Sequence, residues 1–183
     1  LGAGGLKLPY VEVYLILTVA LLLGAPFFVF WGWLSDRIGR RGIMTTGFAL
    51  AVITYWPVFT LFGVFKDNPT ILTLLVFYLV ILVTMVYGPI AAFLVELFPA
   101  RIRYSSMSLP YHVGNGVFGG GVPFIATWLA QTFASIPLIG LAYPVAVAAV
   151  GIVVSSTAVR EPTHEVKIWD EVGGAAPLVA DQP

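Results

Sequence analysis

Two short segments of this chain combine acidic residues with arginines, and the first of them suits ion pairs between neighbouring helix ends. It reads GWLSDRIGRRG, residues 32–42, and its glycines permit a tight reversal between two helices. Charge is tolerated here if the segment lies at a membrane interface. The segment combines one acid, Asp36, with three arginines, Arg37, Arg40 and Arg41. An ordinary positively charged loop is the alternative interpretation.

The second charged segment reads ELFPARIRY, residues 96–104, and places Glu96 ahead of Arg103 across a proline that ends a helix. We expect a Glu96–Arg103 ion pair, with Arg40 or Arg41 as a third member. Such a network could latch helix ends in one conformation and release them in another. The alternative is a single exposed pair, worth about 0–1 kcal/mol.

Four polar residues inside apolar runs are candidates to face a polar solute: Tyr87, Tyr111, His112 and Asn115. An interfacial or packing role is the alternative for Tyr87. Tyr111 and Asn115 share a helix face because they are spaced by i, i+4. Asn115 equally suits a hydrogen bond between helices, worth about 0.6 kcal/mol in a membrane. His112 is a possible titrating group near neutral pH, and a packing role is the alternative.

The remaining residue types speak against several kinds of site. The chain has no cysteine and two histidines, which leaves little for a metal cluster. The sequence shows no nucleophile–base pair, phosphate-binding loop or metal-ligand spacing. We therefore expect no catalytic residue, metal or cofactor, and a protein that is not an enzyme. The formal net charge is zero, so the chain has no net positive charge that would favour binding to nucleic acid.

Membrane-spanning helices must position these residues. Hydrophobic residues make up 59% of the chain and charged residues 10%, whereas soluble domains carry about 25% charged residues. The apolar runs are long and do not alternate, which favours helices over the strands of a barrel. Charge-free runs predict five spans, at residues 13–35, 42–65, 70–95, 105–132 and 138–159.

The distribution of lysine and arginine predicts the orientation. Seven of the nine lie on one side of the predicted spans, which places that side in the cytoplasm. The N-terminus of the chain is then outside and the C-terminus inside. Residues 161–183 are acidic and rich in small residues, and we expect a disordered cytoplasmic tail. The chain begins at Leu1 rather than Met, which suggests a fragment of a longer protein.

The order of residues in GWLSDRIGRRG resembles the signature loop of the major facilitator superfamily. The string ELFPARIRYSSMSLPYHVGNGVFGGGVPFIATWL is similar to the metabolite:proton symporter branch of that superfamily. The resemblance implies that residues 1–160 form the C-terminal five helices, eight to twelve, of a twelve-helix fold whose N-terminal half and helix seven are not in this chain. It also implies a cytoplasmic gating role for Gly32, Asp36, Arg37, Gly39, Arg40, Arg41, Glu96 and Arg103.

The resemblance further implies secondary active transport in a plasma (inner) membrane. The expected activity is symport of a small polar metabolite, an organic acid or an osmolyte, with protons by alternating access. The expected partners are the substrate, protons, membrane lipid and the missing N-terminal half. Since no Asp, Glu, Lys or Arg lies at membrane depth, we expect the proton-carrying carboxylate in that half. The alternatives are a sugar uniporter or drug exporter of the same superfamily, or a membrane scaffold that transports nothing.

Overall fold

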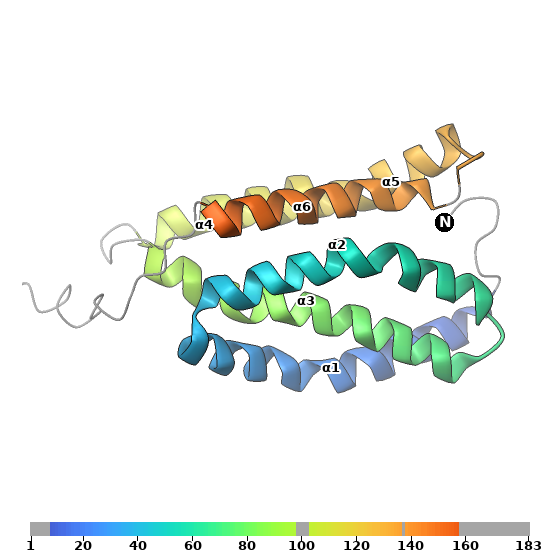
Figure 1. The fold of residues 1–183 in the computed structure, drawn as a ribbon, viewed down its shortest axis with the longest axis horizontal. Helices are drawn as coiled ribbons and strands as arrows, with labels where there is room; N and C mark the ends of the chain where they lie inside the picture. Colours follow the sequence, from blue (N-terminus) through green and yellow to red (C-terminus); the bar gives the residue numbers. More distant parts are fainter. Residues whose placement is uncertain (1–7, 98–102, 137, 158–183) are drawn as a thin grey trace, which may run out of the picture.

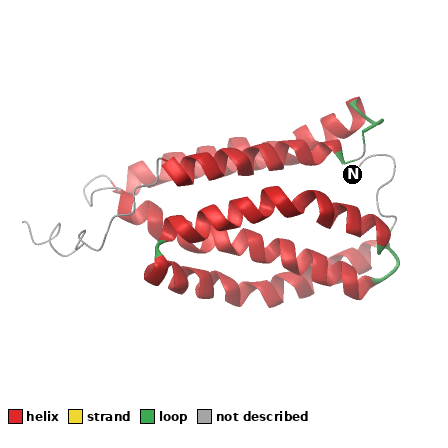
Figure 2. Cartoon of the chain, viewed as in Figure 1, coloured by secondary structure: helices red, strands yellow, loops and turns green. Residues whose placement is uncertain are grey.

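The computed structural model describes residues 8–97, 103–136 and 138–157, with the backbone alone at residues 97 and 103–105. Every regular element in these ranges is helical (Figure 2). The predicted tail, residues 161–183, lies outside the described residues. In chain order the elements are α1 (Tyr10–Ile38), α2 (Arg40–Val64), α3 (Pro69–Leu97), α4 (Arg103–Val113), the π-helix η2 (Gly114–Gly119), α5 (Gly120–Thr132), the short 3-10 helix η3 (Ile139–Leu141) and α6 (Ala142–Thr157).

Four helical stretches are long and apolar enough to cross a membrane, with mean hydropathy between 1.7 and 2.5. Their surfaces expose large apolar side chains, and Leu22, Val29 and Ile53 are 73%, 76% and 69% exposed. Water disfavours such surfaces by about 25 cal/mol per Å², whereas lipid accepts them. Helices also satisfy their own backbone hydrogen bonds, as a bilayer requires. The all-α integral membrane class predicted from the sequence is confirmed. The four stretches are Tyr10–Ile38, Arg40–Val64, Pro69–Glu96 and Ile139–Thr157.

The run at residues 105–132 forms a rod of three consecutive helical segments, α4, η2 and α5, rather than one α-helix. The N–H of Gly120 donates to the carbonyl oxygen of Asn115, which is the wider i→i+5 spacing of a π turn. Three of the six residues in η2 are glycine, and glycine costs a helix about 1 kcal/mol relative to alanine. Pro123 also has no N–H to give to the carbonyl of Gly119. The local sequence therefore weakens the α-helix where the π turn replaces it.

The helices run side by side along a common direction. α3 packs against both α1 and α2, and α6 packs against α2 (Figure 1). The rod of α4, η2 and α5 lies beside α6, which α5 contacts. The α1–α2 turn, the end of α3, the start of α4 and the end of α6 all lie at one end of the bundle, on the left in Figure 1. This end therefore brings Glu96 of the second charged segment close to the first charged segment.

Small residues let the helices approach closely. A Cβ atom at Gly88 of α3 would lie 2.9 Å from the carbonyl oxygen of Phe28 and 3.2 Å from the nitrogen of Gly32. Both contacts are to the backbone of α1, so a side chain at Gly88 would push the two helices apart. The buried core beside this crossing is apolar and is formed by Ile43, Ala51, Leu82, Met85 and Ala148.

Candidate functional site: a charged latch and a polar contact in the bundle

The turn between α1 and α2 consists of one residue, Gly39. α1 ends at Ile38 and α2 begins at Arg40, and Gly39 has a φ of 98°. L side chains rarely adopt this conformation, so the turn favours glycine. The N–H of Gly39 donates to the carbonyl oxygen of Ser35 at 3.1 Å, which closes α1. The reversal therefore brings the last turn of α1 against the first turn of α2.

Arg40 joins three helix ends at this turn. Its Nη2 atom lies 2.8 Å from a carboxylate oxygen of Asp36 on α1 and 2.6 Å from one of Glu96 on α3. The Arg40 side chain is 15% exposed and that of Glu96 is 26% exposed, whereas Asp36 is 59% exposed. Water screens an exposed pair strongly and a partly buried one less. The contact with Glu96 therefore contributes more than the contact with Asp36.

The two other arginines of the first segment have different partners. The guanidinium of Arg37 lies 4.1 Å from the ring centre of Trp33, within the range of a cation–π contact. Arg41 donates to the carbonyl oxygen of Ser156 near the end of α6. One turn away, the hydroxyls of Thr45 and Ser155 are hydrogen-bonded at 2.8 Å between α2 and α6. The same end of the bundle thus connects α6 to α2, which Arg40 in turn joins to α1 and α3.

Gly32, the remaining candidate of the first segment, lies where α1 passes α3. A Cβ atom there would meet the carbonyl oxygen of Gly88 at 3.8 Å. Its own carbonyl oxygen accepts a hydrogen bond of 2.6 Å from the hydroxyl of Ser35, which is buried. Gly32 is therefore part of the close α1–α3 crossing just inside the charged end.

The predicted partner of Glu96 from the second segment, Arg103, has no described side chain, so the Glu96–Arg103 pair stays a prediction. Arg40 was expected as a third member of that network, and the structure places it against Glu96. We call the group of Asp36, Arg40 and Glu96 the charged latch.

A polar contact joins α3 to η2 farther along the bundle. The hydroxyl of Tyr87 donates to the side-chain oxygen of Asn115 at 2.8 Å. Tyr87 is 43% exposed and Asn115 is half-buried, so the pair remains accessible from one side. Both groups are neutral and can donate and accept hydrogen bonds. They could therefore bind a polar solute without the cost of an uncompensated charge in a membrane.

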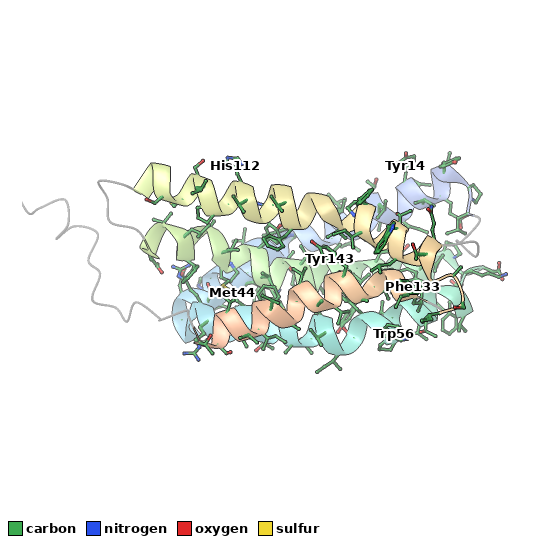
Figure 3. All side chains as sticks on the ribbon, turned by 90° about the horizontal axis from the view of Figure 1, so that it is seen from above. Tyr14, Met44, Trp56, His112, Phe133 and Tyr143 are labelled. Carbon is green, nitrogen blue, oxygen red and sulfur yellow. The ribbon has the colours of Figure 1, made fainter. Side chains whose placement is uncertain are left out.

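Tyr111 and His112 lie apart from this pair. Both are exposed, and their rings contact each other edge to face with centres 5.9 Å apart. His112 points away from the body of the bundle (Figure 3). The structure therefore brings together Tyr87 and Asn115 among the four candidates, and leaves Tyr111 and His112 on an open surface of α4.

An apolar cavity of about 780 Å³ lies between α1, α2 and α3 on one side and α5 and the segment before α6 on the other. Phe28, Tyr55, Val80 and Ala126 are among the side chains that line it. Neither Tyr87 nor Asn115 is part of this lining. Among the described residues there is no group of three or more His, Asp or Glu side chains that could hold a metal ion.

Comparison with known proteins assigns the family. The sequence profile of the Major Facilitator Superfamily matches residues 3–180. The chain belongs to the major facilitator superfamily. The resemblance inferred from GWLSDRIGRRG is thereby confirmed, and in this superfamily member the motif forms the end of α1, the turn at Gly39 and the start of α2. No solved structure shows a significant match to the chain.

Several curated relatives are named as transporters. The citrate-proton symporter of Klebsiella pneumoniae is 36% identical over 121 residues, which is 63% of this chain and 26% of the relative. The inner membrane metabolite transport protein YhjE of Escherichia coli is 33% identical over 144 residues, 75% of this chain and 31% of the relative. The ectoine/proline transporter ProP of Corynebacterium glutamicum is 31% identical over 122 residues, 66% of this chain and 23% of the relative. The matches thus span about a third or less of each relative's length.

Three contacts of this superfamily member were not anticipated from the sequence. On α6, the hydroxyl of Ser155 accepts a hydrogen bond from Thr45, and the backbone carbonyl oxygen of Ser156 accepts one from Arg41. The hydroxyl of Ser155 near the end of an apolar run is the signal for the first contact, and the residue type gives no signal for the second. Tyr143 on α6 donates its hydroxyl to the carbonyl oxygen of Phe118 in η2 at 3.2 Å. A tyrosine near the end of a span usually indicates a membrane interface, so this position gave no reason to expect a contact with another helix.

Proposed function

We propose that this chain is part of a secondary transporter, and not of an enzyme, that moves a small polar metabolite together with protons. Its membership of the major facilitator superfamily supports this proposal. So do relatives named as a citrate-proton symporter, a metabolite transport protein and an ectoine/proline transporter. The substrate class is accordingly an organic acid or an osmolyte. The described helices are helices eight to twelve of a twelve-helix fold in this proposal.

The observation that carries the mechanism is the bridge made by Arg40. The guanidinium group of Arg40 on α2 binds one carboxylate from α1 and one from α3. A protein that opens this end of the bundle must separate these charges, and one that closes it must bring them together. The charged latch therefore stabilises one state of alternating access and opposes the other. We assign the surrounding Gly32, Arg37, Gly39, Arg41 and Arg103 to the same gating region.

The Tyr87–Asn115 pair is the proposed contact for the substrate. A solute with hydroxyl, carboxylate or amide groups would replace this hydrogen bond with its own bonds to the phenol and the amide. Tyr111 and His112 are proposed as further substrate-facing positions because they are exposed on the neighbouring turns of the same rod. The charged residues of the described spans lie near helix ends, so we place the proton-carrying carboxylate in another part of the full-length protein.

The orientation completes the proposal. The end of the bundle that holds the charged latch faces the cytoplasm, because the loops on this side carry most of the lysine and arginine. Residues 161–183 would then extend from α6 into the cytoplasm. The membrane is the plasma (inner) membrane, as the name of the Escherichia coli relative indicates for that protein.

Uptake by the full-length protein tests the function. Proteoliposomes with an inward proton gradient are given radiolabelled citrate, proline or ectoine, and the same vesicles with a collapsed gradient are the control. We expect accumulation of one of these solutes above its external concentration when the gradient is present. Uptake that does not respond to the gradient would indicate a uniporter and contradict proton symport, and no uptake of any of the three would contradict the proposed substrate class.

A further inference from the structure

The π-helix η2 receives hydrogen bonds from two helices. Tyr87 of α3 donates to the side chain of Asn115, and Tyr143 of α6 donates to the carbonyl oxygen of Phe118. The two donors are both tyrosine hydroxyls, and they meet η2 at positions three residues apart. Figure 3 shows Tyr143 between α6 and the rod that contains η2.

Few other contacts hold η2 in place. None of its residues is buried, and a Cβ atom at Gly114 or Gly116 would meet nothing within 4 Å. Side-chain packing therefore contributes little to its position. The glycines lower the stability of the helix itself, and Pro123 removes a backbone hydrogen bond just beyond the segment. The position of η2 therefore depends strongly on its two hydroxyl contacts. The packed helices depend less on any single hydrogen bond, because many side chains hold them in place.

The two contacts differ in what they restrain. Tyr87 holds the side chain of Asn115, which a substrate could displace. Tyr143 holds the backbone at Phe118, and it does so whichever partner the Asn115 amide has. Gly121 lies beside this contact, since a Cβ atom there would be in ordinary van der Waals contact with the Tyr143 hydroxyl at 3.6 Å.

We propose that Tyr143 is a positioning residue for the substrate contact. By binding the carbonyl of Phe118, it fixes the location of η2 relative to α6 and keeps the Asn115 amide beside Tyr87. The substrate would meet Asn115 and not Tyr143, so Tyr143 acts through the backbone of η2. This inference rests on the proposed function of Asn115.

Hydrogen–deuterium exchange of the full-length protein in lipid nanodiscs tests the contact without any substrate. Tyr143→Phe removes the hydroxyl and keeps the ring. We expect exchange of the amides of residues 114–119 to become about threefold faster, the factor that corresponds to one hydrogen bond between helices in a membrane. Tyr78→Phe is the matched control, because it removes a hydroxyl that donates to Thr54 at 3.1 Å between α3 and α2. Equal exchange of residues 114–119 in the two variants would overturn the inference.

Uptake of whichever of the three solutes the protein accumulates provides the second measurement. We expect Tyr143→Phe to raise the KM about threefold with an unchanged maximal rate, because a displaced Asn115 weakens substrate binding and leaves the gating charges intact. An unchanged KM in a variant with faster exchange would also overturn the positioning role. An unchanged KM in Asn115→Ala would instead overturn the substrate site itself, so the two failures are distinguishable.

Discussion

The Nη2 atom of Arg40, at the first position of α2, lies 2.6 Å from the carboxylate of Glu96 near the end of α3. The two side chains are 15% and 26% exposed, so the pair is partly withdrawn from solvent. Partly buried charge-assisted hydrogen bonds are stronger than exposed ones, and they are costly to leave unpaired. This pair therefore has the location and the strength required of a contact that forms in one state of a carrier and breaks in another.

Neutralising Glu96 should slow transport more than it weakens substrate binding. Glu96→Gln keeps the shape of the side chain and removes the charge that Arg40 requires. We expect the maximal rate of uptake to fall about tenfold, which corresponds to the loss of one hydrogen bond to a charged group, with little change in KM. Asp36→Asn should slow transport less, because Asp36 is 59% exposed. Arg103→Ala should also lower the rate, if Arg103 joins the same network.

Uptake rates and equilibrium binding on the full-length protein check this prediction. An equal loss of rate and of affinity in Glu96→Gln would reject the gating role of the charged latch.

The substrate contact makes a different prediction. Tyr87→Phe removes the hydroxyl that donates to Asn115, and Asn115→Ala removes its acceptor. We expect both variants to raise the KM, Tyr87→Phe by about threefold and Asn115→Ala by more, since the amide also loses its own bonds to the solute. The maximal rate should change less than in Glu96→Gln. Concentration series of uptake measure the two constants, and unchanged KM values in both variants would rule out this pair as the substrate site.

The α1–α3 crossing predicts a loss of stability. Gly88→Ala would place a methyl group 2.9 Å from the carbonyl oxygen of Phe28, and a backbone atom cannot move aside like the end of a side chain. We expect a destabilisation of about 1–3 kcal/mol. Gly63→Ala is the matched control, because a Cβ atom there meets nothing within 4 Å. Thermal unfolding in detergent compares the two, and equal melting temperatures would show that the helices do not cross so closely.

The orientation is testable with single cysteines, since this chain has none of its own. Ile38 is 63% exposed and lies beside the turn at Gly39, and Lys66 is exposed at the opposite end of the bundle. We choose Ile38→Cys and Lys66→Cys for labelling. In cells that express a cysteine-free full-length protein, we expect a membrane-impermeant maleimide to label Lys66→Cys directly. Ile38→Cys should react after the cells are made permeable. The reverse pattern would invert the proposed topology.

The sequence predicts the helices well because a bilayer imposes a simple rule. A charge-free run must be helical and long enough to cross, and α1 and α3 differ from their predicted runs by a few residues at the ends. The same rule does not predict which type of helix, α or π, forms along the rod from Arg103 to Thr132. The glycines around Asn115 weaken an α-helix. The π turn itself depends on which carbonyl oxygen each N–H bonds to, and the spacing of residue types does not determine that choice.

The candidate site was only partly predictable for a related reason. The Arg40–Glu96 contact follows from opposite charges at helix ends that must lie on the same side of the membrane. The contact between Tyr143 and Phe118 involves a backbone carbonyl, and every residue carries one. Its location depends on the packing of α6 beside the rod, which hydropathy does not determine. Charge therefore identified one part of the site, and only the arrangement of the helices shows the other.

The single-residue connection at Gly39 has a mechanical consequence. Two backbone torsions separate α1 from α2, so a change in the tilt between these helices rotates them about one point. α1 has 29 residues, and at 1.5 Å per residue it forms a lever about 43 Å long. A rotation of about 10° at the turn would move its far tip by about 7 Å. Small displacements among the charges near the pivot would thereby be amplified at the far tip of α1.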